Sequence, residues 1–177
     1  MADAKPFAPV KYVCGIIYAD QAARDEAASR LTGLLGPVDL RSETFAFDMT
    51  EYYEKEMGRG LKRVFLSFAE LGPPDRLAGI KLRTNGWERE IGSGTGEGRR
   101  AVNLDPGYLT ASALFMATAK DFAHRVALRD GIYAHLELLF TRQGARALDW
   151  TYPDFRREAQ TTFFLEARRI YLEAIRG

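Results

Sequence analysis

Strand-like and helix-like hydrophobic patterns follow one another in a regular order over residues 10–105. Strands are indicated where apolar residues run together or alternate with polar ones, and helices where they recur every three or four residues. Strand patterns cover 11–18, 38–47, 64–68 and 99–104, and helix patterns cover 20–36 and 73–91. The order β-α-β-β-α-β is typical of a ferredoxin-like fold, in which both helices pack on one face of an antiparallel sheet. We therefore predict an α+β fold.

The second half of the chain, residues 106–177, is predicted to extend this sheet rather than to fold alone. Its first segment, 108–119, is apolar nearly all round, which indicates a buried helix capped by Asp105 with Pro106 in its first turn. An antiparallel hairpin follows, because Asp130-Gly131 between two alternating segments is a strong turn signal. The remaining patterns are strands at 123–129, 132–142 and 145–150 and a C-terminal helix at 154–175. We predict one domain over 1–177, with a ferredoxin-like half at 10–105 and an extension at 106–177.

Charge and cysteine content narrow the classes of function. The 25 Lys and Arg residues nearly balance 24 Asp and Glu, so we do not expect nucleic acid as the main partner. Cys14 is the single cysteine and lies in an apolar run, which indicates a buried thiol and excludes an intrachain disulfide. No apolar stretch approaches 18 residues and the N-terminal segment has no signal core, so we expect a cytoplasmic protein that does not enter a membrane.

The familiar cofactor and catalytic motifs are missing from the sequence. The glycine-rich segment 92–98 follows a predicted helix and precedes a strand, which is the reverse of the order in a phosphate-binding loop. There is no G-x-G-x-x-G at the start of a helix, no H-E-x-x-H and no G-x-S-x-G. The sequence therefore does not indicate which cofactor, if any, the protein uses.

The chain contains only two histidines, and the predicted hairpin places both near a carboxylate. A two-residue turn would put His124 opposite Glu137 and Val126 opposite His135. His124, His135 and Glu137 would then share one sheet face, where they could serve as a base with its orienting partner. A metal site would need a clear fourth group, so we predict none. The alternative is an ordinary cross-strand His–Glu pair.

Polar and aromatic residues gather at the ends of several predicted elements. Asp105 and Tyr108 lie where a strand is followed by a helix, and Lys120, His124 and Arg125 lie where that helix is followed by a strand. Such residues commonly line a pocket, but Asp105 and Lys120 could equally complement the two ends of the helix. Further candidates for the pocket are Tyr52, Lys81, Asn85, Tyr152 and Asp154.

Six stretches distributed over nearly the whole chain carry a resemblance to a known family. They are residues 47–58, 80–85, 102–109, 120–125, 131–134 and 150–154. On these stretches the chain resembles the bacterial family known as domain of unknown function 4416. The resemblance implies a bacterial protein and assigns no activity or catalytic residue. In similar sequences a carboxylate often stands at the position of His135, so the resemblance favours His124 as the functional histidine.

Two hypotheses of different kinds follow from these residues. In the first, the protein binds or acts on a small anionic ligand, such as a nucleotide or phosphorylated metabolite, in a polar and aromatic pocket. His124 and Asp105 would then be catalytic, with His124 as the acid or base, and Lys120 and Arg125 would contact the anion. The alternative is a non-enzymatic module that binds RNA or a protein partner through its sheet. The sequence leaves open whether the protein is an enzyme and whether it forms oligomers.

Overall fold

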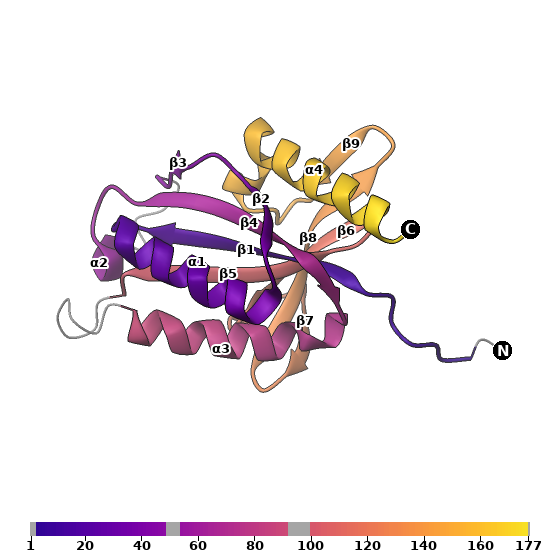
Figure 1. Ribbon diagram of the computed structural model, residues 1–177, viewed down its shortest axis with the longest axis horizontal. Coiled ribbons are helices and arrows are strands. Elements are labelled where there is room, and N and C mark those ends of the chain that lie inside the picture. The colour runs from indigo at the N-terminus through magenta and orange to yellow at the C-terminus, as the bar shows by residue number, and fades with distance from the viewer. Residues whose placement is uncertain (1–2, 49–53, 92–99, 177) are drawn as a thin grey trace.

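The computed structural model describes residues 3–48, 54–91 and 100–176 of the 177-residue chain as an α+β fold (Figure 1). In this part of the chain nine strands form one sheet in the order β2-β4-β1-β5-β6-β8-β7, with β3 beside β4 and β9 beside β8. The strands are β1 (Val10–Tyr18), β2 (Val38–Arg41), β3 (Phe45–Ala46), β4 (Lys62–Gly72), β5 (Val102–Leu109), β6 (Ala113–Thr118), β7 (Arg125–Arg129), β8 (Ile132–Thr141) and β9 (Gly144–Ala147). The helices are α1 (Gln21–Leu35), α2 (Glu54–Met57), α3 (Leu77–Glu90) and α4 (Glu158–Ala174), with 3₁₀ turns η1 (Pro74–Arg76) and η2 (Pro153–Arg156).

Strand β1 is buried along its whole length and separates two apolar layers. On one face Cys14 and Ile16 pack in a cluster with Leu31 of α1 and Ile80 of α3. On the other face Val13 joins a cluster that contains buried side chains of α4. Figure 1 accordingly shows α1 and α3 together on one face of the sheet and α4 on the other. Among the described helices, none is long and apolar enough to cross a membrane.

Two turn signals in the sequence are confirmed by the backbone. Asp20 caps α1 by accepting a hydrogen bond from the N–H of Ala23 (3.0 Å), and the helix ends at Gly36, whose φ is 91°. Asp130 and Gly131 form the predicted hairpin turn with φ values of 54° and 75°. Positive φ at both positions is what a two-residue turn between twisted strands requires.

Several other elements have the predicted type but different boundaries. The strand pattern at 38–47 is divided between β2 and β3, and the helix pattern at 73–91 begins with η1 before α3. The predicted C-terminal helix at 154–175 begins with η2, and α4 itself starts at Glu158. Helix and strand ends depend on local hydrogen bonds that hydrophobic spacing does not specify.

The segment 108–119 is the β5–β6 hairpin, so the predicted buried helix is wrong. The hydroxyl of Thr110 supports the turn by accepting hydrogen bonds from the backbone N–H groups of Ser112 (3.2 Å) and Ala113 (3.1 Å). A short run of apolar residues suits a strand buried on both faces as well as a buried helix, and periodicity cannot separate the two.

The same correction changes the roles predicted for Asp105, Pro106 and Lys120. Asp105 and Pro106 lie inside β5 and cap no helix, and Lys120 follows the strand β6 instead of a helix. Proline cannot donate a hydrogen bond to a neighbouring strand. Pro106 is tolerated because β6 pairs with β5 only from Gly107 onward, so no strand lies on that side of Pro106.

A β-bulge follows the hairpin turn and shifts the register between β7 and β8 by one residue. Arg125 lies opposite His135 in the ladder. The predicted pairs, Val126 with His135 and His124 with Glu137, are therefore wrong. The extra residue that a bulge inserts cancels the strict alternation on which both pairs were based.

We predict that Gly107→Ala destabilises the fold where β5 meets β6. A Cβ atom at Gly107 would lie 2.4 Å from both Met116 Sδ and the backbone carbonyl oxygen of Phe115. The expected loss in the free energy of unfolding, measured with urea, is about 1–3 kcal/mol, typical of an overpacked core. Gly33→Ala in α1 is the matched control, because nothing lies within 4 Å of a Cβ there. That control should stabilise the protein by about 0.5–1 kcal/mol; equal effects of the two substitutions would contradict the prediction.

Candidate functional site

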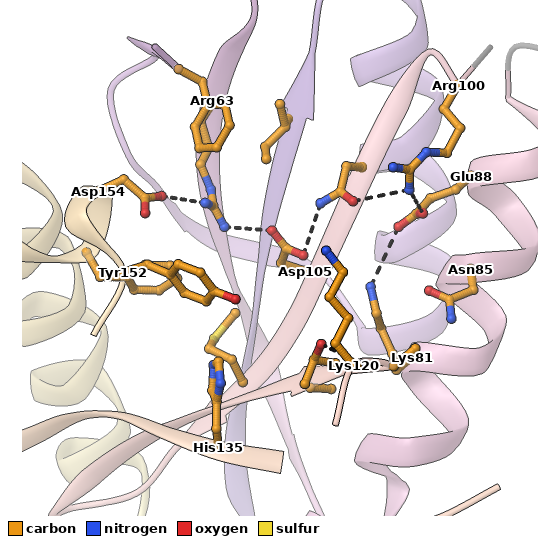
Figure 2. A pocket seen from close by; sticks show the side chains of 18 of the residues that line it. Arg63, Lys81, Asn85, Glu88, Arg100, Asp105, Lys120, His135, Tyr152 and Asp154 are labelled. Carbon is orange, nitrogen blue, oxygen red and sulfur yellow. Dashed lines mark hydrogen bonds and ion pairs between the residues drawn. The ribbon is translucent and has the colours of Figure 1, made fainter. Parts of the chain in front are cut away.

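A cavity of about 580 Å³ opens where β5 and β6 separate (Figure 2). The two strands pair only from Gly107↔Met116 to Leu109↔Leu114, so the first half of β5 and the end of β6 diverge. Helix α3 lines one side of the gap, and η2 with the residues before it lines the other. The polar lining residues include Arg63, Lys81, Asn85, Glu88, Arg89, Arg100, Asn103, Asp105, Thr118, Lys120, His135, Tyr152 and Asp154.

Arg63 of β4 joins two carboxylates across the base of this cavity (Figure 2). Its guanidinium donates to Asp105 of β5 (2.8 Å) and to Asp154 of η2, and the side chains of Arg63 and Asp154 are almost completely buried. The Arg63 side chain lies directly over Gly15, where a Cβ would come within 2.7 Å of the guanidinium. Burial raises the pKa of Asp154, and the charge of Arg63 partly offsets that rise. The bridge therefore compensates one buried acid, Asp154, and one partly buried acid, Asp105.

Two buried side chains of α3 take the place of a missing strand beside β5. Lys81 Nζ donates to the carbonyl oxygen of Leu104 (2.6 Å), and the N–H of Leu104 donates to Glu88 Oε1 (2.8 Å). Arg100 donates to the second oxygen of Glu88 (2.8 Å). Because both backbone groups of Leu104 are satisfied in this way, β5 needs no partner strand at this position and the cavity stays open.

On the opposite wall His135 of β8 is held by a buried carboxylate. His135 Nε2 lies 2.8 Å from Glu137 Oε2, and the two side chains are 3% and 0% exposed. Glu137 Oε1 accepts a hydrogen bond from the backbone N–H of Tyr152 (2.7 Å), which fixes the carboxylate. His135 Nδ1 and Glu137 Oε2 are both buried, and neither has a partner of hydrogen-bond geometry among the described residues.

The structure brings together more than half of the residues proposed from the sequence. Those that line the cavity are Asp105, Lys120, Lys81, Asn85, Tyr152 and Asp154. His124, Arg125 and Tyr108 lie outside its lining, and Tyr52 lies outside the described residues. The residues in the cavity come from α3, β5, the end of β6 and η2, so no local sequence pattern could have grouped them.

Tyr108 and Arg125 are excluded from the cavity for geometric reasons. Tyr108 follows Asp105 by three positions on one strand, so their side chains point to opposite faces of the sheet. Tyr108 packs instead against the apolar cluster of Ala78 and Ile132, and burial raises the pKa of its hydroxyl. Arg125 donates to the carbonyl oxygen of Lys120 (2.7 Å) and to the Tyr152 hydroxyl (3.0 Å) behind the cavity wall.

His124 belongs to a stack of rings next to the cavity. Its imidazole is parallel to Trp150 within 8° at a centroid distance of 5.1 Å, and it lies 5.7 Å from the His135 ring. Removal of the ring from water lowers the pKa of His124, and the neighbouring His135 and Arg125 lower it further. The neutral form is therefore favoured near neutral pH.

Arg63, Glu88 and Asn103 line the cavity but were not proposed from the sequence. For two of them, Arg63 and Glu88, the spacing from buried neighbours indicated a position on the buried face of the element. Arg63 has the same strand parity as the buried Phe65, and Glu88 follows the buried Thr84 by one helical turn. A charged residue in phase with a buried face is a reasonable site candidate, because burial of a charge requires a partner.

The chain belongs to the family described as domain of unknown function (DUF4416), whose model matches residues 8–171. This confirms the resemblance seen in the sequence. No curated protein and no solved structure matches the chain. Within residues 3–48, 54–91 and 100–176, no group of three or more His, Cys, Asp or Glu side chains is arranged to hold a metal ion.

We predict that Arg63→Met destabilises the protein by about 3–5 kcal/mol, because it leaves two carboxylates without their cation. Urea unfolding measures the change. The double variant Arg63→Met/Asp154→Asn should recover part of the loss, since one of the uncompensated charges is then removed. Arg83→Met, an exposed residue of α3 outside the cavity, is the control and should change stability by less than about 0.5 kcal/mol. Equal losses in Arg63→Met and Arg83→Met would show that the bridge does not matter.

We predict that His124 titrates below its ordinary pKa of 6.5 in the folded protein. The C2–H proton signal in an NMR titration reports this value directly. Trp150→Ala should move the pKa back upward, because the stacked indole helps to keep water from the ring. Since the folded-state pKa is depressed, His124 favours the native state above its unfolded-state pKa, and this contribution disappears as the pH falls through the folded-state value. A midpoint at or above 6.5 would contradict the assignment.

Proposed function

We propose that this protein binds a small anionic molecule, a nucleotide or phosphorylated metabolite, in the cavity between α3, β5 and η2. The observation that carries the proposal is the composition of the lining, which holds five Lys and Arg side chains against three carboxylates. These cations converge from separate elements in a protein whose net charge is only +1. Concentrated positive charge in a concave site attracts and orients anions.

The size and mixed character of the cavity support a small organic ligand over a bare ion. Its volume of about 580 Å³ is within the range of roughly 300–1,000 Å³ that is usual for small-molecule sites. Ile17, Met116 and Phe155 contribute apolar surface, and Asn85, Asn103 and Tyr152 contribute neutral hydrogen-bonding groups. Lys120 extends into the cavity on the side of Asp105 and Lys81 (Figure 2). A phosphate would lie near these lysines, and the uncharged part of the ligand would contact the apolar wall.

A second candidate function is a non-enzymatic module that binds a protein or RNA. It is favoured by exposed apolar side chains on and near the edge strand β7, namely Phe122, Val126, Leu128 and Trp150. An exposed strand edge can pair with a segment of another chain. The near-zero net charge argues against RNA as the partner, because phosphate contacts dominate nucleic-acid affinity.

We further infer a ferredoxin-like plan for the first half and a cytoplasmic location. Strands β2, β4, β1 and β5 are neighbours in that order, with α1 and α3 on one face, as a β-α-β-β-α-β unit would arrange them. The single cysteine, Cys14, is buried and free, which agrees with a reducing compartment.

The test compares ribose 5-phosphate with ribose in thermal unfolding and isothermal titration calorimetry. Ribose 5-phosphate at 100 times its Kd should stabilise the protein by about 2.7 kcal/mol, which raises Tm by roughly 5–10 °C. Ribose should bind at least about tenfold more weakly, because it lacks the charge that the lysines recognise.

Lys120→Met is the informative variant, because Lys120 is exposed in the cavity and its loss should not affect folding. It should weaken ribose 5-phosphate binding by about tenfold, or 1.4 kcal/mol. Lys62→Met, an exposed lysine at the start of β4 outside the cavity, is the matched control and should bind like the unmodified protein. Equal affinities of Lys120→Met and the unmodified protein, or no binding of ribose 5-phosphate, would refute the proposal.

A further inference from the structure

His135 is a buried residue of the cavity lining with an unsatisfied hydrogen-bonding atom. The side chain is 3% exposed and lines the cavity, and its Nδ1 has no hydrogen-bond partner among the described residues. An unsatisfied buried polar atom costs about 1–3 kcal/mol. Such an atom in a native structure calls for an explanation, and a ligand that occupies the cavity supplies one. Figure 2 shows the imidazole projecting from β8 toward the space between Tyr152 and Asp105.

Glu137 determines which nitrogen of His135 carries the proton. His135 Nε2 lies 2.8 Å from Glu137 Oε2, although Oε2 has no partner of hydrogen-bond geometry among the described residues. A proton on Nε2 is the arrangement that this close contact favours, because a bare nitrogen lone pair would repel the carboxylate. We therefore assign the proton to Nε2, which leaves on Nδ1 a lone pair that no described residue satisfies. The carboxylate cannot turn away easily, since the backbone N–H of Tyr152 holds Oε1 and the hydroxyl of Thr151 donates to the Glu137 carbonyl (2.5 Å).

The surroundings of His135 keep the ring in place and separate it from bulk water. The titratable and charged groups that face it are Glu137 on its own strand, His124 and Arg125 from the β7 side, and Tyr152 before η2. The His124 ring and Trp150 stack behind it, outside the cavity. The cavity lies on the remaining side, so a ligand that contacts Nδ1, an atom buried in the ligand-free protein, must approach from there.

We propose that His135 is the proton acceptor of this cavity and that its Nδ1 receives a hydroxyl group of a phosphorylated polyol, with Glu137 as the positioning residue. The proposal rests on the proposed function and narrows the ligand class to an anion with at least one hydroxyl group. On full proton transfer the O–H bond breaks, its electron pair stays on the oxygen, and an N–H bond forms at Nδ1. Glu137 then compensates the charge of the imidazolium, and the cationic lining compensates that of the oxygen.

The first test reads the tautomer of His135 by ¹⁵N NMR in the ligand-free protein. The chain has only two histidines, so the spectrum contains two imidazoles and His124→Gln assigns them. We expect a protonated Nε2 and a bare Nδ1 for His135. In Glu137→Gln the side-chain amide can donate to Nε2, which should shift the ring toward the Nδ1–H tautomer. A protonated Nδ1 in the unmodified protein, or a tautomer that Glu137→Gln leaves unchanged, would overturn the assignment.

The second test measures whether a hydroxyl is recognised. At pH 8 ribose 5-phosphate and methyl phosphate both carry a dianionic phosphate, but only the first has hydroxyl groups. We expect ribose 5-phosphate to bind about tenfold more tightly, and its addition to shift the ¹⁵N resonance of Nδ1. His135→Phe keeps a ring of similar size without an acceptor and should lose the preference while it still binds methyl phosphate.

His124→Phe makes the same chemical change at the histidine outside the cavity and is the matched comparison. Retention of the preference in His135→Phe overturns the inference, whatever His124→Phe does, and so does equal binding of the two phosphates by the unmodified protein. In both cases methyl phosphate still binds, so the proposed function survives. No binding of either phosphate overturns the proposed function as well. The NMR test uses the unmodified protein, so it determines the tautomer of His135 even if His135→Phe does not fold.

Discussion

The ionic bridge made by Arg63 is the interaction on which the cavity depends. One guanidinium compensates Asp105 on β5 and Asp154 on η2, which are 42 and 91 positions away in the sequence. Burial of these acids without the cation would be costly, because removal of one partner leaves an uncompensated charge in a medium that solvates it poorly. Gly15 leaves the room that the guanidinium needs above β1. The polar base of the cavity, the sheet and the C-terminal layer are therefore one interdependent unit.

The open half of β5 is the second constraint, and it explains why a cavity exists at all. A strand edge inside a protein must satisfy its backbone groups. Here Lys81 and Glu88 of α3 do so at Leu104, and β6 is free to diverge. The same two side chains line the cavity, so the groups that complete the sheet also set the charge that a ligand would meet. Stability and the proposed binding are linked through these residues.

The two histidines show how position separates chemically equal side chains. Their rings are 5.7 Å apart, yet only His135 lines the cavity and only His135 has a carboxylate against its ring. His124 stacks on Trp150 and lies outside the cavity lining, which suits a packing role. A single inserted residue in β7 produces this arrangement, because the bulge changes which residues of β7 and β8 face each other.

Features that depend on neighbouring residues could be predicted from the sequence. The cap at Asp20 and the turn at Asp130-Gly131 result from local hydrogen bonding and positive φ, and both were predicted correctly. The polar and aromatic groups at element ends also pointed to Asp105, Lys120 and Tyr152 as pocket residues, and all three line one cavity.

The sequence by itself determined the amphipathic elements, their turns and the supply of polar side chains, because these depend on spacing and local backbone chemistry. Only the tertiary structure decided that 108–119 is a hairpin, because burial on both faces removes the periodicity that separates strand from helix. It also decided that Arg63, Glu88 and His135 meet Asp105 around one cavity. Which side chains meet around the cavity depends on sheet register and on the divergence of β5 from β6. Both are set by contacts between residues far apart in the chain.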